Sequence, residues 1–158
     1  MNSYKDKIQD VLRHIQNVQN NCIILGEKLI DNGDHEMAKK LIANGLIHDN
    51  SKFSGIEFEA FTSESPDPIL LKHAVIHHQK TNPHHPEYWA NGIKDMPQLY
   101  LAEFVCDVKA RSSEFGTNIR EWIDEEATLK FGFKKEESIY LEIMKYLDMV
   151  CDKPFKKL

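Results

Sequence analysis

Residues 4–30, YKDKIQDVLRHIQNVQNNCIILGEKLI, carry the pattern that decides the fold. Their apolar side chains recur at alternating steps of three and four, at Ile8, Val11, Ile15, Val18, Cys22, Leu25 and Leu29. This spacing places them on one face of an α-helix. The segment Asn32-Gly33-Asp34 follows and favours a break. We therefore predict one long amphipathic helix over residues 4–30.

The rest of the chain also predicts helices. We expect them at about residues 36–48, 54–61, 67–79, 97–114, 119–127 and 135–152. Ser54-Gly55-Ile56-Glu57 has the form of a capping box at the start of the third. Glycine and proline are sparse, with seven and six residues, which favours long helices. The prediction is an all-α bundle of about six to seven helices, forming a single domain over residues 1–158.

Composition and charge exclude some classes of partner. The formal net charge is -5 and the basic residues are dispersed, so a long nucleic acid is not expected. A nucleotide or small phosphate ester stays open, because a bound metal would supply positive charge. No apolar run approaches about 18 residues, so we expect no membrane partner and a cytoplasmic protein. Cys22, Cys106 and Cys151 are interpreted as reduced core residues.

Adjacent His48 and Asp49 stand at the end of the second predicted helix. Together they offer a nitrogen and an oxygen ligand, a pair that suits Fe, Mn, Zn or Ni, although the dipeptide is also frequent by chance. His14 lies at the margin of the apolar stripe of the first helix. That position fits a half-buried histidine bonded to a carbonyl as well as a metal ligand.

Glu103 and Asp107 are the only charges in an otherwise apolar stretch, Leu99 to Val108, which predicts a central helix. Their i, i+4 spacing puts both carboxylates on one face, where they repel unless a cation or donor lies between them. The alternative is an Asp107–Arg111 ion pair with Glu103 in solvent.

A histidine-rich segment, HHQKTNPHHPEYW, covers residues 77–89. It contains four histidines in nine residues, His77, His78, His84 and His85. Pro83 and Pro86 exclude a regular helix through the second half. Tyr88 and Trp89 follow directly, which indicates a loop packed against the domain rather than a free surface loop.

The order of these residues resembles a known pattern. His14, then His48-Asp49, then clustered histidines, then Asp107 is similar to the HD superfamily of metal-dependent phosphohydrolases. More closely, LIHDNSKF, the segment 77–89, Met96-Pro97 and the Glu-x-x-x-Asp helix resemble an uncharacterised family of small bacterial and phage HD-like proteins. The resemblance covers about residues 11–122, and the C-terminal helix at about 135–152 lies outside it. Pro86 stands where that family often has Trp, and Lys80-Thr81 replaces a His-Arg pair.

The resemblance implies a metal site. By the HD pattern, His14, His48, Asp49 and Asp107 hold a first metal. One or more of His77, His78, His84 and His85 either hold a second metal or act as a general acid. Of these four, His77 and His78 are the metal-ligand candidates, and His84 and His85 are the catalytic candidates. The implied cofactor is one or two divalent transition metals, drawn from Fe, Mn, Ni, Zn and Co.

The resemblance also implies residues that meet substrate. Lys52 is the expected contact for a phosphate oxygen, and its other interpretation is a cap on the carbonyls of the second helix. Glu87 is expected beside the substrate or behind a histidine, and is otherwise exposed. Arg111 is a further candidate for binding substrate.

The implied activity is hydrolysis of a nucleotide or other small phosphate ester, with Asp49, Lys52, His84 and His85 as the catalytic set. Two other functions fit the same residues. One is a di-iron oxygenase, which the extra histidines permit. The other is a catalytically silent module that binds a metal or nucleotide. A homodimer is possible in each case.

Overall fold

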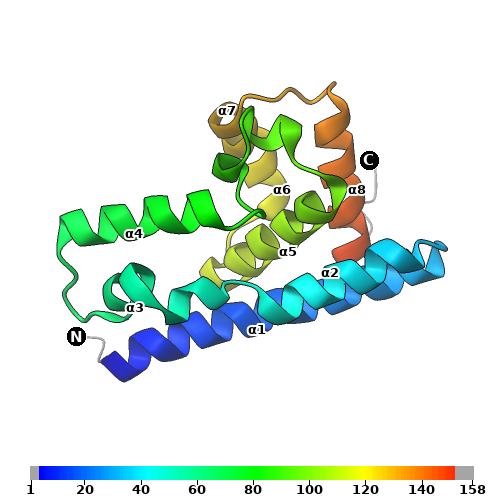
Figure 1. The fold of residues 1–158 in the computed structure, drawn as a ribbon. Helices are drawn as coiled ribbons and strands as arrows, with labels where there is room; N and C mark the ends of the chain where they lie inside the picture. The colour runs from blue at the N-terminus through cyan, green and yellow to red at the C-terminus, as the bar shows by residue number, and fades with distance from the viewer. Residues whose placement is uncertain (1–3, 152–158) are drawn as a thin grey trace.

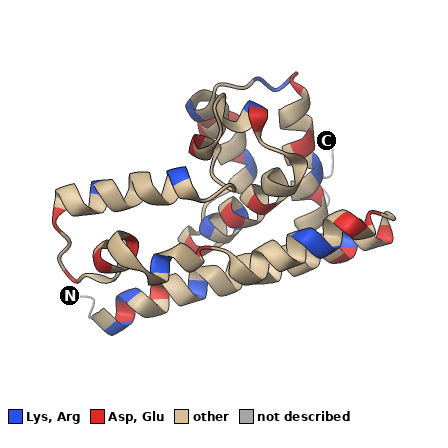
Figure 2. Ribbon diagram, viewed as in Figure 1, with Lys and Arg blue, Asp and Glu red and all other residues tan. Residues whose placement is uncertain are grey.

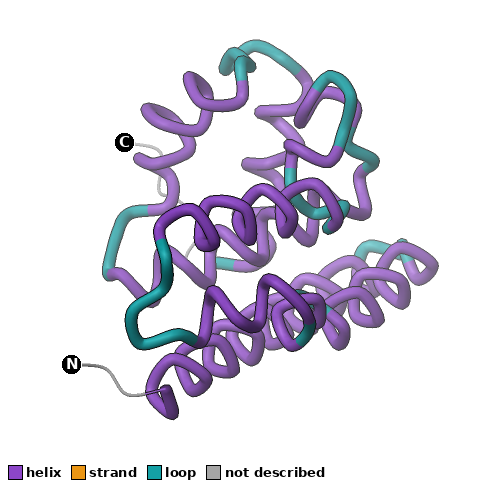
Figure 3. The backbone as a smooth tube through the Cα atoms, turned by 60° about the vertical axis from the view of Figure 1, so that its left-hand side comes forward, coloured by secondary structure: helices purple, strands orange, loops and turns teal. Residues whose placement is uncertain are grey.

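The computed structural model describes residues 4–151, and in that range helices joined by short loops make up the fold (Figure 1, Figure 3). The α-helices are α1 (Tyr4–Asp31), α2 (His35–Ile47), α3 (Gly55–Thr62), α4 (Pro68–Thr81), α5 (Gln98–Phe115), α6 (Ile119–Trp122), α7 (Thr128–Phe131) and α8 (Ser138–Val150). Short 3-10 turns are η1 (Asn50–Phe53), η2 (Pro86–Tyr88) and η3 (Gly92–Asp95), and η4 (Ile123–Ala127) is a π-helix.

The prediction of an all-α, single-domain fold is confirmed. The π-helix η4 joins α6 to α7 without a break, so the described residues form seven helices and no strand. None of these helices combines the length and apolar character needed to span a bilayer. Lys and Arg, and Asp and Glu, are scattered over the helices seen in Figure 2, as expected from the dispersed charge of the sequence.

Helices α1 and α2 form a long antiparallel hairpin along one side of the bundle (Figure 1). Gly33, with a φ of 86°, makes the turn, and Asp34 caps α2 by accepting from the Met37 N–H. The helices approach closely at Gly45, where an added Cβ would lie 2.7 Å from the Cys22 Cβ. A larger residue there would push the two helices apart.

Helix α5 lies at the centre and packs against α1, α2 and α8. Leu101, Ala102, Val105, Cys106 and Ala110 are all buried on its surface, which explains why this segment is apolar nearly all round. The far end of the core is filled by α8 and the α6–η4–α7 run. Helix α4 instead packs against α3 and η2, at the other end of the molecule.

Candidate metal centre

Four separate segments bring five histidine and aspartate side chains to one buried position. His14 comes from α1, His48 and Asp49 follow α2, His78 comes from α4, and His84 comes from the loop before η2. Each is at most 6% exposed. Asp49 has a φ of 58°, in the left-handed region that costs a non-glycine residue roughly 1–3 kcal/mol. The strained backbone at Asp49 allows the side chains of two consecutive residues, His48 and Asp49, to be buried together.

Asp49 is the hub of the cluster, and its two oxygens face different histidines. The Oδ1 atom lies 3.1 Å from His78 Nε2 and 3.3 Å from His84 Nε2. The Oδ2 atom lies 3.5 Å from His48 Nε2 and 3.8 Å from His14 Nε2. One carboxylate is therefore shared between two groups of nitrogen atoms.

Asp107 completes the side of the cluster nearest α5. Its Oδ1 lies 3.0 Å from His14 Nε2, and its Oδ2 lies 3.9 Å from His84 Nε2. The alternative Asp107–Arg111 pair does not form, because Arg111 pairs instead with Glu114 at 3.3 Å. Glu103 is not solvated either, since it is 3% exposed and accepts from Asn44.

Three glutamates hold the outer nitrogens of three of these histidines. The pairs are His14 Nδ1 with Glu114 Oε1 at 3.1 Å, His48 Nδ1 with Glu103 Oε1 at 2.9 Å, and His78 Nδ1 with Glu57 Oε2 at 2.7 Å. A carboxylate on Nδ1 keeps the proton there and leaves the Nε2 lone pair directed inward. This is the arrangement typical of histidines that ligate metals.

Glu57 corrects one prediction from the sequence. The capping box is wrong, because the Ser54 side chain makes no cap bond and instead donates to the Ser51 carbonyl. Glu57 is fully buried and accepts from the Ser51 hydroxyl at 2.8 Å as well as from His78. Ser followed three residues later by Glu fits both arrangements, so the spacing alone does not separate them.

Glu114 was also missed from the sequence, although a signal was present. Glu103, Asp107 and Glu114 are separated by four and seven residues, which places all three on one face of α5. Continuing the Glu103–Asp107 pattern by two more turns would have found the third carboxylate.

His77 and His85 lie differently from their predicted roles. His77 sits on the outer side of Glu57, with Nδ1 2.7 Å from Glu57 Oε1 and its side chain 51% exposed. The structure does not bring it to the cluster, because consecutive helical residues point about 100° apart. His85, expected in catalysis, lies against His78 and His84, with ring centroids 4.7 and 4.3 Å away.

Groups of potential ligand atoms lie within 4.8 Å of one another in three combinations. They are His14, His48 and Asp49; then Asp49, His78, His84 and His85; then His48, His84 and Asp107. The Nε2 atoms of His48, His84 and His85 are buried and have no hydrogen-bond partner in the described residues. Buried polar atoms are rarely left so, and mixed imidazole and carboxylate donors fit a divalent transition metal.

The electrostatics keep the carboxylates ionised. Burial favours the neutral form of Asp49, but His48, His78, His84 and Lys52 outweigh it and hold its pKa well below the usual range. Burial opposes ionisation of Asp107 too, and His14 and His48 lower its pKa despite that.

The pKa values of two of the histidines, His84 and His85, are shifted in opposite directions. Burial lowers the pKa of His84, but interactions with Asp49 and Glu103 outweigh it and raise the value to about 10. Burial, together with the neighbouring His84, lowers the pKa of His85 to about 3. His85 is therefore a neutral imidazole at neutral pH, the form that ligates metals.

A cavity of about 410 Å³ opens over the cluster, and both predicted basic contacts line it. Lys52 Nζ lies 2.6 Å from Asp49 Oδ2 and the side chain is nearly buried, so its charge serves the cluster and not the end of α2. Arg111 stands at the cavity wall with its side chain 45% exposed. No hydrogen bond or ion pair joins Glu87 to a histidine among the described residues, and its Oε1 accepts from Gln79 at 3.4 Å in the neighbouring cavity.

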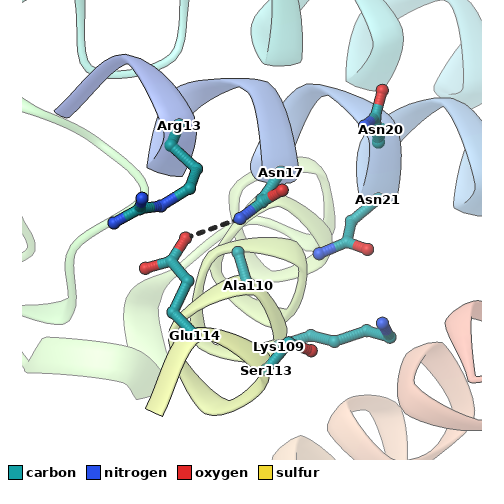
Figure 4. Close-up of a pocket in the computed structure, with 8 residues that line it drawn as sticks. All are labelled: Arg13, Asn17, Asn20, Asn21, Lys109, Ala110, Ser113 and Glu114. Atoms are coloured by element: carbon teal, nitrogen blue, oxygen red, sulfur yellow. Dashed lines mark hydrogen bonds between the residues drawn. The ribbon is translucent and has the colours of Figure 1, made fainter. Parts of the chain in front are cut away.

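A third hollow, of about 420 Å³, lies on the other side of Glu114, between α1 and α5 (Figure 4). Its walls are polar and include Arg13, Asn17, Asn20 and Asn21. Asn17 donates to Glu114 Oε1 at 2.9 Å, so one carboxylate oxygen is held by Asn17 and His14 together (Figure 4). Glu114 thus separates this hollow from the histidine cluster.

Comparison with known proteins places the chain without supplying an activity. A family model, described as a family of unknown function (DUF5662), matches residues 3–153. No curated protein and no solved structure gives a significant match.

Proposed function

The chain belongs to the DUF5662 family of unknown function, and we propose that it is a metal-dependent phosphohydrolase acting on a nucleotide or other small phosphate ester. The observation that carries the proposal is a buried set of imidazole and carboxylate donors with three imidazole nitrogens left without hydrogen-bond partners. The order of these residues also resembles the HD superfamily, whose members include metal-dependent phosphohydrolases.

The residues divide into two ligand sets that share Asp49. His14, His48, Asp49 and Asp107 would hold one metal, and Asp49, His78, His84 and His85 would hold a second. When bound, such metals supply Lewis-acid stabilisation of phosphoryl charge and a water nucleophile at neutral pH. The division follows the two Asp49 oxygens, each of which faces one set.

The basic residues of the cavity would bind the phosphate. Lys52 presents an ammonium group beside Asp49, and Arg111 offers a planar guanidinium suited to two phosphoryl oxygens. His85 is neutral and buried, which favours a ligand role over that of a general acid. His84 Nε2 faces the same Asp49 oxygen as His78, which favours a ligand role for His84 as well.

Metal content and hydrolysis together test the proposal. The protein is loaded with Mn, Co, Ni, Zn or ferrous Fe, desalted and analysed for metal, then assayed with nucleoside monophosphates and an aryl phosphate. We expect about one to two metals per chain and turnover that Asp107→Asn abolishes. Asp148→Asn, an exposed acid on α8 paired with Arg120, is the matched control and should change neither. Full metal content with no turnover of any ester would leave a metal-binding module and overturn the hydrolase.

The second ligand set favours one competing function. Three histidines and one carboxylate form an imidazole-rich environment that suits iron. A di-iron oxygenase would consume oxygen when the ferrous protein is mixed with air-saturated buffer and a reduced organic substrate. Oxygen uptake that depends on His85, without phosphate release, would select this function instead.

A further inference from the structure

A second cavity, of about 480 Å³, adjoins the one over the histidine cluster. Five residues line both cavities: Gln79, His85, Asp107, Val108 and Arg111. A molecule with its phosphate over the cluster would therefore extend past these side chains into the second cavity. The two volumes meet at Asp107, one of the candidate ligands.

The far wall of the second cavity is aromatic and aliphatic. It is formed by Phe104, Phe115, Ile119, Trp122 and Phe131, from α5, α6 and α7. Phe104 is almost fully buried, and Trp122 and Phe131 are half-buried, so the wall is held in place by the core behind it. Aromatic side chains arranged in this way favour a flat, apolar ligand.

The near end of the cavity is polar. Gln79 donates to Glu87 Oε1, while the other Glu87 oxygen, Oε2, is buried and has no hydrogen-bond partner in the described residues. An unsatisfied buried acceptor is costly unless a ligand donates to it. The cavity, which Glu126 and Lys130 also line, therefore offers an apolar wall together with a buried acceptor for an N–H or O–H group.

We propose that the second cavity binds the leaving group of the ester, and that the substrate is a phosphomonoester of a flat aromatic or heteroaromatic group. This inference rests on the proposed hydrolase function. In the reaction the P–O bond to the leaving group breaks and a P–O bond to a water oxygen forms. One proton from that water passes to the leaving oxygen, which departs as a hydroxyl.

Arg111 links the two halves of this substrate. It lines both cavities and is held by Glu114, so its guanidinium stands where phosphate and ring would join. A small polyol phosphate would occupy only the first cavity, and the apolar wall would then stay in contact with water. We therefore expect the apolar wall of the second cavity, and not the histidine cluster, to discriminate aromatic phosphates from polyol phosphates.

Binding of the leaving group alone provides a test that does not depend on turnover. 1-Naphthol is titrated into the metal-loaded protein, and binding is followed by calorimetry and by quenching of tryptophan fluorescence. We expect binding in the wild type and at least about tenfold weaker binding in Trp122→Ala. Phe115→Ala is a second variant, since Phe115 is 74% exposed and its truncation leaves the core intact. Leu129→Ala, an exposed α7 residue outside the cavity, is the control.

Kinetics then connect the cavity to the ester. The ratio of kcat/KM for 1-naphthyl phosphate to that for glycerol 2-phosphate should exceed about tenfold in the wild type. It should fall toward one in Trp122→Ala and Phe115→Ala, with metal content unchanged. Equal kcat/KM for both esters, with variants unaffected, would overturn the leaving-group assignment and leave the hydrolase standing. No hydrolysis of either ester would overturn the proposed function itself, whatever the naphthol titration shows.

Discussion

Helix α1 belongs to two regions of opposite character, and the contrast explains how the molecule is built. Its C-terminal half places Cys22, Leu25 and Leu29 in an apolar core with α2, α5 and α8. Its N-terminal half places His14 among buried carboxylates and imidazoles. The same amphipathic stripe thus changes from apolar to ligand-bearing within three turns.

The two regions are stabilised differently. The apolar end is stabilised by burial and close packing of hydrocarbon side chains, without a bound metal. The polar end buries ionised carboxylates and several imidazoles, which is expensive unless the groups are paired or bind a metal. Protein stability should therefore reside at one end, and metal dependence at the other.

Truncation at the apolar end gives the largest expected loss of stability. Leu25→Ala removes a fully buried side chain and should lower the free energy of unfolding by about 2–5 kcal/mol. The loss, measured by urea unfolding, should be the same with and without metal. Leu129→Ala, 84% exposed, should change stability by less than about 0.5 kcal/mol. A metal-dependent loss at Leu25 would mean that the two regions are not independent.

Metal removal gives the next largest effect, at the polar end. A metal at about a thousand times its Kd should raise the free energy of unfolding by about 4 kcal/mol, and chelation should reverse it. The readout is Tm by calorimetry across a metal titration. In Asp49→Asn the shift should vanish, because the shared side chain loses its negative charge and one of the two oxygens that face the two ligand sets. An equal shift in this variant would place the metal elsewhere.

Glu57 tests the outer carboxylates. Glu57→Gln keeps the volume but weakens the hold on His78 Nδ1, so metal affinity should fall by about 10–100-fold. Competition with a chelating dye measures this change. Glu59→Gln, an exposed acid on the same helix, should leave affinity unchanged.

The smallest effect concerns the loop that carries His84 and His85. The Trp89 indole N–H donates to the Pro83 carbonyl at 2.8 Å and ties this loop down. Trp89→Phe should cost about 1 kcal/mol in urea unfolding. It should also weaken metal binding, whereas Tyr88→Phe, at an exposed neighbour, should do neither. Unchanged affinity in Trp89→Phe would show that the loop is held by its prolines alone.

Several features of the site were predictable because they depend on local order along the chain. The spacing of Glu103 and Asp107 indicated a shared face on a buried helix, and the structure bears this out with both carboxylates turned toward histidines. The four histidines between residues 77 and 85 likewise marked that segment as part of the candidate site. Glu57 escaped prediction because its partners, His77 and His78, are some twenty residues away in sequence.

The sequence alone determined which segments are helical and which residue types are available, because periodicity and turn residues act over a few positions. It did not determine which histidine nitrogen faces which carboxylate oxygen in the folded protein. His77 and His78 are neighbours on α4, yet only His78 points to Asp49, because α4 packs on α3 in one rotation. Three glutamates, Glu114, Glu103 and Glu57, orient His14, His48 and His78. These pairs form only when α1 and α2 pack against α5, and α4 packs against α3. Long-range packing, which no local pattern encodes, turned a set of ligand-type residues into a candidate metal centre.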